Sequence, residues 1–151
     1  GETSDGYHMT APDPSGDGAK RAMIAALKET NLTPEDIGYI NLHGTATKQN
    51  DKMESIAVNE IFKNKPLCSS TKPLMGHTLG AAGAQELGLC WLLLSHDDPI
   101  LPPHRWDQQQ DPELYELNLI ATQTRLTTPR MMSNSFAFGG SNVSLIIEKE
   151  S

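Results

Sequence analysis

Three short segments of the sequence combine glycine with side chains that move protons or form hydrogen bonds. The first, residues 41–47, places His43 after an apolar run and follows it with a glycine and two hydroxyls, Thr45 and Thr47. Histidine changes its charge near neutral pH and can act as an acid, a base or a neutral donor. The segment therefore fits a catalytic site, although a histidine that only bonds a loop carbonyl would give the same pattern.

The second segment, residues 70–83, holds Lys72 and His77 among several glycines. Its spacing matches neither a phosphate-binding P-loop nor a dinucleotide fingerprint. His77 is expected just ahead of a long helix, and a helix N-terminus disfavours imidazolium, so a neutral ring that donates a hydrogen bond is indicated. The charged partner of the lysine would be one of three acids: Asp51, Glu54 or Glu86. A helix-packing glycine motif with a solvated lysine is the alternative.

The third segment, residues 133–142, has Phe136 and Phe138 on either side of one small residue, followed by two glycines. Glycine lets a backbone approach a ligand closely, and aromatic rings can gate a pocket. A strand-turn-strand hairpin with phenylalanines in the core would look similar. Each segment by itself leaves the choice between chemistry and packing open.

Helices and strands alternate along the part of the chain that must position these segments. Apolar residues at helical spacing predict helices over 18–30, 50–62 and 81–95, with a single turn at 33–36. Apolar runs predict strands over 37–42, 66–70, 131–138 and 143–148. The helix over 81–95 is apolar nearly all round, which is typical of a core helix. This order predicts a layered α/β domain with a mixed sheet.

Composition and charge exclude several classes of protein. The formal net charge of −7 argues against nucleic acid as a partner. The apolar run 87–94 is too short to span a membrane, and the polar N-terminus does not read as a signal peptide, so a cytoplasmic protein is expected. A zinc hydrolase fails because no two histidines have the spacing of a ligand pair. The histidines are His8, His43, His77, His96 and His104.

Together the three segments resemble the C-terminal half of elongating β-ketoacyl-acyl-carrier-protein synthases of the thiolase superfamily. The shared motifs are His-Gly-Thr-x-Thr-x-x-x-Asp, Lys-x-x-x-Gly-His-x-x-Gly-Ala-Ala-Gly and Asn-Ser-Phe-x-Phe-Gly-Gly-x-Asn, and residues 5–12 resemble the segment that precedes them. The resemblance implies an α/β fold, namely the C-terminal half of a thiolase-like fold with a mixed β-sheet and layered helices. Residues 1–151 would form that domain, with the N-terminal nucleophile domain absent.

The resemblance also implies a role for each motif residue. His43 and His77 would bind a malonyl thioester, promote its decarboxylation and stabilise the enolate, a task suited to two neutral imidazole donors. Lys72 would be the active-site lysine, held by Glu54 and Asp51.

Further residues would support this site. Glu86 matches a buried helical glutamate of the family. Thr45 and Thr47 would bind the pantetheine arm of the carrier protein, and Phe136 and Phe138 would gate the acyl pocket. In some members a monovalent cation is surrounded by four residues, here Asn41, Glu86, Ser133 and Asn134. No cofactor is implied.

Two departures from the family matter. Ala137 stands where the family usually has glycine, and at a positive φ it would cost roughly 1 kcal/mol. Neither Cys68 nor Cys90 matches the family's nucleophilic cysteine, and a buried thiol in apolar surroundings is inert. The chain alone is therefore expected not to run the full condensation.

The resemblance implies part of an acyltransferase that performs decarboxylative Claisen condensation of malonyl-acyl carrier protein with an acyl-enzyme thioester, in fatty-acid or polyketide-type synthesis. Its partners would be acyl- and malonyl-loaded acyl carrier protein and the N-terminal half of the same synthase, in a homo- or heterodimer. A partner subunit resembling a chain-length factor and a non-catalytic carrier-protein-binding module are the alternatives. Retention of His43, His77 and Lys72 weighs against the first of these. An apolar sheet face left uncovered predicts that the isolated chain either self-associates through that face or was excised from a longer protein.

Overall fold

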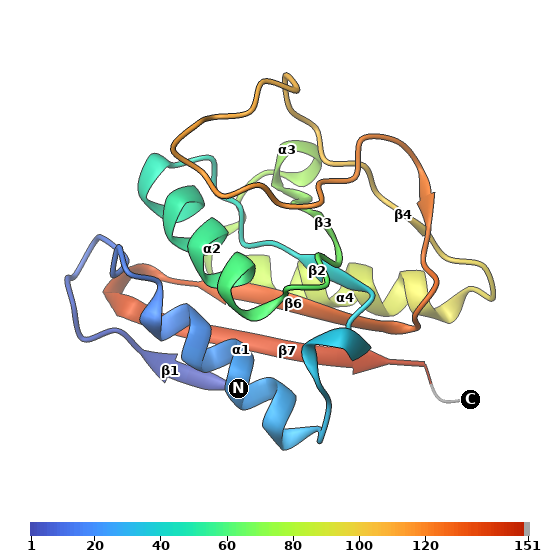
Figure 1. Ribbon diagram of the computed structural model, residues 1–151, viewed down its shortest axis with the longest axis horizontal. Helices are drawn as coiled ribbons and strands as arrows, with labels where there is room; N and C mark the ends of the chain where they lie inside the picture. Colours follow the sequence, from blue (N-terminus) through green and yellow to red (C-terminus); the bar gives the residue numbers. More distant parts are fainter. Residues whose placement is uncertain (150–151) are drawn as a thin grey trace.

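Within residues 1–149, which the computed structural model describes except for the side chain of Phe138, a five-stranded mixed sheet has the order β1-β7-β6-β2-β3 (Figure 1). Its strands are β1 (Glu2–Ser4), β2 (Tyr39–Asn41), β3 (Leu67–Ser69), β6 (Arg130–Phe136) and β7 (Ser141–Glu148). β2 runs parallel to both β3 and β6, whereas β7 is antiparallel to β6 and β1. The carboxyl ends of β2, β3 and β6 therefore meet at one edge of the sheet.

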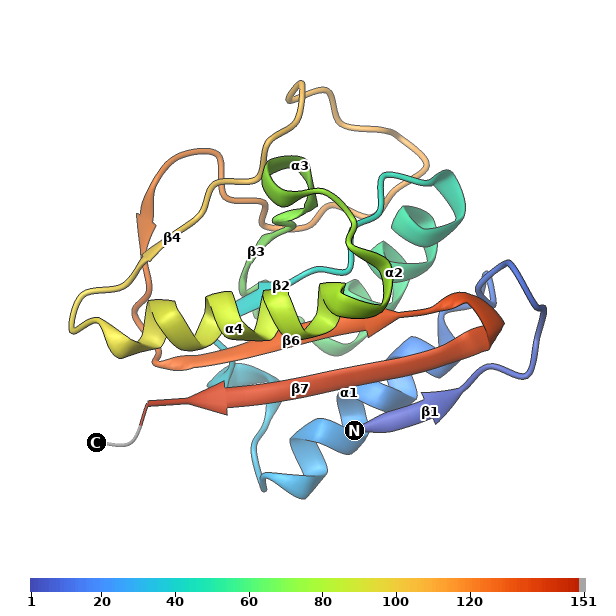
Figure 2. The ribbon, with the colours of Figure 1, turned by 180° about the vertical axis from the view of Figure 1, so that it is seen from behind.

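Helices cover both faces of this sheet. α1 (Asp17–Glu29) and α2 (Lys48–Ile61) lie on one face, and α4 (Ala82–Ser95) lies on the other, along β6 and β7 (Figure 2). Short turns of helix complete the connections, and a small ladder lies apart from the main sheet. These elements are η1 (Pro34–Asp36), α3 (Lys72–Met75), η2 (Leu79–Ala81), η3 (Phe138–Gly140), β4 (Ile100–Leu101) and β5 (Thr124–Arg125).

The core has one layer on each side of the sheet, because successive strand residues point to opposite faces. Ile40 and Met132 pack with the apolar side chains of α1 and α2. Their neighbours Tyr39 and Met131 pack on the other side with Cys90 of α4. The two parallel strands β2 and β6 in the centre of the sheet thus serve both layers.

The predicted elements largely agree with the structure. The helices expected over 18–30, 50–62 and 81–95 are α1, α2 and α4, and the expected turn at 33–36 is η1. The four expected strands are β2, β3, β6 and β7. The sequence did not predict β1, which is short and polar and forms only through its ladder with β7, nor the small ladder of β4 and β5.

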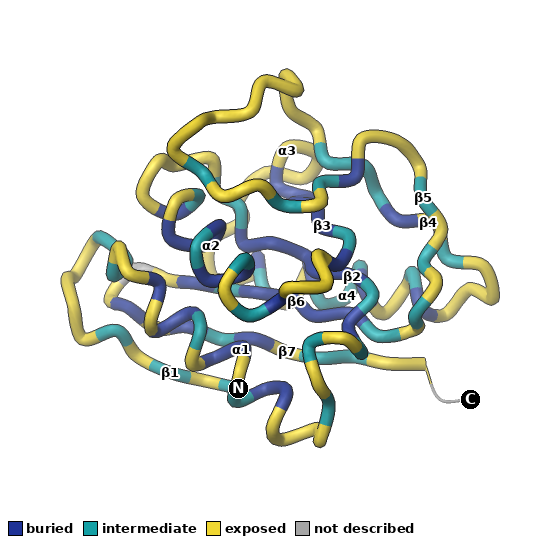
Figure 3. Tube along the Cα trace, in the orientation of Figure 1, coloured by how far each residue is buried: buried dark blue, intermediate teal, exposed yellow. Residues whose placement is uncertain are grey.

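Helix α4 is not the fully buried core helix that its composition predicts. Only a stripe of the helix, Ala82, Glu86, Cys90 and Leu94, is buried, whereas the central strands β2 and β6 are buried along most of their length (Figure 3). Opposite this stripe, Trp91 is 60% and Leu92 is 53% exposed. We call the surface formed by Ala84, Gly88, Trp91, Leu92 and Ser95 the outer face of α4. The expected uncovered sheet face is wrong in detail, because α4 covers that sheet and the uncovered apolar surface belongs to the helix.

No helix in the described part of the chain has both the length and the apolar character needed to cross a bilayer. Exposed apolar side chains that lie together, such as those on the outer face of α4, are typical of a surface that another protein covers.

Self-association of the isolated chain tests this property of α4. Replacing both Trp91 and Leu92 by Glu should weaken self-association at least about tenfold, because burial of each large apolar side chain is worth roughly 1.5–3 kcal/mol. Sedimentation velocity over a range of concentrations measures the effect. Tyr115→Glu, which replaces another large side chain that is 54% exposed, is the matched control. A wild-type chain that stays monomeric at every concentration would contradict the expectation.

Candidate active site

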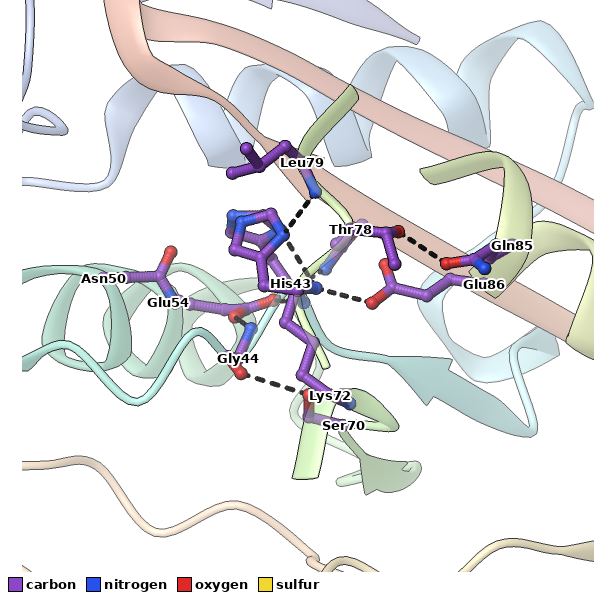
Figure 4. Close-up of polar contacts among 12 residues, drawn as sticks. His43, Gly44, Asn50, Glu54, Ser70, Lys72, Thr78, Leu79, Gln85 and Glu86 are labelled. Atoms are coloured by element: carbon purple, nitrogen blue, oxygen red, sulfur yellow. Dashed lines mark hydrogen bonds and ion pairs between the residues drawn. The ribbon is translucent and has the colours of Figure 1, made fainter. Parts of the chain in front are cut away.

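A cavity of about 550 Å³ opens at the carboxyl ends of the parallel strands, the usual place for sites in such folds. His43 follows β2, Lys72 follows β3, and Phe136 ends β6. His43, His77 and Phe136 line the cavity. The structure thus brings together residues from all three segments that the sequence singled out, and Figure 4 shows how those of the first two segments lie around His43.

His43 is buried, and its surroundings keep the ring neutral. Burial, followed by the charges of Lys72 and His77, lowers the pKa of His43 to about 3. Lys72 Nζ lies 3.4 Å from Nδ1 of the ring. Because an ammonium group can only donate, Nδ1 is the acceptor and the proton of the neutral ring is on Nε2. The ring also meets those of His77 and Phe136 edge-on, with centroids 5.5 and 5.8 Å away.

His77 takes the same tautomer through a different contact. The backbone N–H of Leu79 donates to its Nδ1 over 3.2 Å, which assigns the proton of a neutral ring to Nε2. His77 lies just ahead of the long helix α4, as expected, with η2 between the two. A helix dipole acts only within about the first turn, so the backbone N–H of Leu79 replaces it as the orienting group.

Lys72 and Glu86 form a buried ion pair. Nζ of Lys72 lies 2.5 Å from Oε1 of Glu86, and both side chains are almost fully buried. Burial raises the pKa of Glu86, while the hydrogen bond and charge of Lys72 oppose the rise. The expectation that Glu54 and Asp51 hold this lysine is wrong, because the partner comes from α4.

Glu54 instead holds the backbone of the first of the three motif segments. Its two carboxylate oxygens accept the N–H groups of His43 and Gly44, each over 2.9 Å. Burial outweighs these bonds and raises the pKa of Glu54 to about 7. Asp51 accepts a hydrogen bond from the Asn50 side chain and faces a second cavity, which Glu54 also lines.

The threonines and the third segment complete the lining. Thr47 caps α2, its hydroxyl lies 3.0 Å from that of Thr45, and both line the cavity. The side chain of Phe138 lies outside the described residues. Ala137 has an extended backbone with φ −108°, so the expected strain of an alanine at this position is absent.

Several buried polar side-chain atoms have no hydrogen-bond partner among the described residues. They include both side-chain heteroatoms of Asn41, Oγ of Ser133 and Oε2 of Glu86. Asn41 and Ser133 face each other across the β2–β6 ladder. Oxygen donors of this kind suit a hard cation. Asn134 fits less well, because its Oδ1 already accepts from Ser144 over 2.8 Å.

The sequence did not single out every residue that lines the cavity. Thr10 and Pro12 do so from the N-terminal loop, and Gln49 does so from α2. The resemblance of residues 5–12 was the only signal for the first two. Gly83 is needed for close packing, because a Cβ there would lie 2.8 Å from Oγ of Ser135.

This sheet, with helices on both faces and the site at its parallel edge, is a thiolase-like α/β fold. A solved ketosynthase from Xenorhabdus doucetiae, in complex with its chain length factor, aligns with 99% of this chain and 38% of its own at 52% identity and a TM-score of 0.94. A solved beta-ketoacyl synthase from Burkholderia phymatum aligns with 100% of this chain and 36% of its own at 38% identity and a TM-score of 0.90.

The chain belongs to the beta-ketoacyl synthase family, whose C-terminal domain model it matches over residues 1–105. Among curated relatives, 3-oxoacyl-[acyl-carrier-protein] synthase 1 of Escherichia coli is 41% identical over 150 residues, which are 99% of this chain and 35% of that protein. The chain therefore spans about a third of the length of the curated relatives it matches. The family and the thiolase-like fold that the sequence motifs implied are confirmed.

Breaking the buried ion pair between Lys72 and Glu86 should destabilise the fold. Glu86→Gln leaves a buried ammonium without a countercharge and should lower the free energy of unfolding by about 3 kcal/mol. Urea denaturation measures the loss. Glu113→Gln breaks the exposed pair with Lys52, whose atoms lie 3.5 Å apart, and should change stability little. Equal effects of the two substitutions would contradict a buried, structure-bearing pair.

The low pKa of His43 should appear as a pH dependence of stability. In the unfolded chain His43 has its ordinary pKa of 6.5, whereas in the folded chain it binds a proton only near pH 3. The contribution of neutral His43 to the free energy of unfolding is therefore complete above pH 6.5. It is lost as the pH falls from 6.5 towards about 3. Between about pH 7 and about pH 4.5 the loss should be about 2.5 kcal/mol.

His43→Gln should remove this loss, and urea denaturation of both proteins at the two pH values isolates it. The comparison is needed because Glu54, with its raised pKa, contributes in the opposite direction. Identical pH dependence of the variant and the wild type would show that His43 titrates normally in the folded chain.

Proposed function

We propose that this chain carries the malonyl-binding and decarboxylating part of a β-ketoacyl-acyl-carrier-protein synthase. The observation that carries the proposal is the pair of imidazole rings, His43 and His77, which line one cavity with Nδ1 engaged and Nε2 left as the donor. The names of the relatives, which are 3-oxoacyl-acyl-carrier-protein synthases and ketosynthases, support the same reaction.

The two donors suit the charge that this reaction develops. Loss of CO₂ from a malonyl thioester leaves its electron pair in an enolate, whose negative oxygen lies on the former thioester carbonyl. Two N–H donors aimed at that oxygen stabilise the enolate. Its carbon then attacks the carbonyl of an acyl thioester, forming the carbon–carbon bond and expelling a thiolate. Lys72 and Glu86 keep His43 in the tautomer that can donate.

The remaining motif residues would bind the rest of the substrate. Thr45 and Thr47 offer hydroxyls at the cavity wall, where the amides of a pantetheine arm could bond. Phe136 and Phe138 would separate the acyl pocket from the malonyl site. The oxygens of Asn41, Ser133 and Glu86 that have no hydrogen-bond partner would hold a monovalent cation. This cation would fix the position of the Lys72–Glu86 ion pair and would take no part in the bond changes of the reaction.

The acyl-accepting thiol would come from a domain outside this chain. Burial raises the pKa of Cys90 to about 12 and also raises that of Cys68, so neither forms a thiolate readily. Residues 1–151 would thus be the C-terminal domain of a longer synthase, inactive in the full condensation by itself. The N-terminal half would cover the outer face of α4, and acyl carrier protein would deliver both acyl and malonyl groups to the resulting dimer.

Release of CO₂ from malonyl-acyl carrier protein by the full-length protein tests the proposal. His43→Ala and His77→Ala should each lower the rate about 10²–10³-fold, as loss of one oxyanion donor typically does. His96→Ala, on an exposed residue that ends α4 outside the cavity, is the control and should leave the rate unchanged. Binding of malonyl-acyl carrier protein without CO₂ release would favour a non-catalytic module. CO₂ release without condensation would favour a partner subunit resembling a chain-length factor.

A further inference from the structure

His104, which belongs to none of the three motif segments, contacts the end of β3. The backbone N–H of the buried residue Ser70 donates to Nδ1 of His104 over 3.0 Å. Burial lowers the pKa of His104, consistent with a ring whose Nδ1 is free to accept. The ring therefore satisfies a backbone donor directly between β3 and Lys72.

Ser70 in turn joins the two catalytic segments. Its hydroxyl donates to the carbonyl of Gly44 over 3.1 Å and accepts the backbone N–H of Lys72 over 3.3 Å (Figure 4). One oxygen thus links the turn that follows His43 to the start of α3. The packing is tight, because a Cβ on Gly44, which has φ +45°, would lie 2.6 Å from Cβ of Ser70.

His104 is itself fixed by the backbone beside β3. Its N–H donates to the carbonyl of Ile120 over 2.7 Å, and the N–H of Ile120 donates to the carbonyl of Cys68 over 3.0 Å. The segment around residue 119 thus pairs with the outer edge of β3. The next backbone donor beyond β3, the N–H of Ser70, bonds to the imidazole of His104. The loop over 102–123 thereby anchors Ser70 as well as the strand.

We propose that Ser70 and His104 are positioning residues that set His43 relative to Lys72. Nζ of Lys72 and Nδ1 of His43 are 3.4 Å apart, at the outer limit of a hydrogen bond, so a small displacement of either backbone segment separates them. Once they are separated, Nδ1 of His43 can carry the proton and Nε2 no longer donates reliably into the cavity. This role rests on the proposed function, because it acts through the donor pair that stabilises the enolate.

Two substitutions at His104 separate the hydrogen bond from the bulk of the ring. His104→Leu keeps apolar volume but removes the acceptor, whereas His104→Asn can place Oδ1 where Nδ1 was. In the full-length protein, His104→Leu should lower kcat for malonyl decarboxylation about 10- to 100-fold, since misplacement by an ångström has effects of this size. KM should rise less than kcat falls, because the substitution acts through the tautomer of one ring and leaves His77 and the rest of the cavity lining in place. His104→Asn should recover most of kcat.

Ser70→Ala, which removes the bridging hydroxyl, should give a reduction of kcat similar to that of His104→Leu. The double variant should show a smaller reduction than the product of the two single effects, because both act through one network. A fall in melting temperature with unchanged kcat in His104→Leu would show that the residue only stabilises the fold, and would overturn the proposal.

The ring ¹⁵N resonances of His43 give a readout that does not depend on activity. The wild type should show a single neutral tautomer with the proton on Nε2, and His104→Leu should show a mixture of tautomers. Unchanged His43 resonances in His104→Leu overturn the positioning role. Failure of the proposed function looks different: the wild type releases no CO₂, or His43→Ala releases it as fast, while the His43 resonances still respond to His104→Leu.

Discussion

The ion pair between Lys72 and Glu86 is the interaction on which the rest of the site depends. It joins the segment after β3 to α4, the helix on the far side of the sheet, and both charges are removed from water. A buried charge persists only with a close partner, so the pair fixes how deeply α4 packs and where the ammonium group lies. The ammonium group then orients His43. The orientation of His43 in the cavity therefore depends on how α4 packs against the sheet.

Much of this arrangement follows from local sequence. α1 and α2 bury one side, which gives apolar residues at helical spacing. β2 and β3 are buried on both faces of the sheet, which gives short apolar runs. The histidines were identifiable because each stands at the end of such a run or beside glycines. Parallel strands then bring their carboxyl ends, and these side chains, to a common edge.

Other features depend on interactions between distant parts of the chain and left no local signal. Three acids could have paired with Lys72, and only the packing of α4 selects Glu86 over Glu54. Glu54 instead binds two backbone N–H groups, a role that no side-chain pattern reveals. His104 approaches Ser70 from 34 residues away. The outer face of α4 misled the sequence prediction for a related reason: an apolar helix looks the same whether its own domain or another surface covers it.

The outer face of α4 can vary in sequence without disturbing the fold of this chain. Trp91 fills no place in the core of this chain, so a polar residue there would leave the fold intact and make the chain more soluble. Selection on the folding of this chain alone would let such changes accumulate. Selection exerted by a complementary surface would instead keep an apolar side chain at this position, and the residues of α4 and of that surface should then change together over evolutionary time.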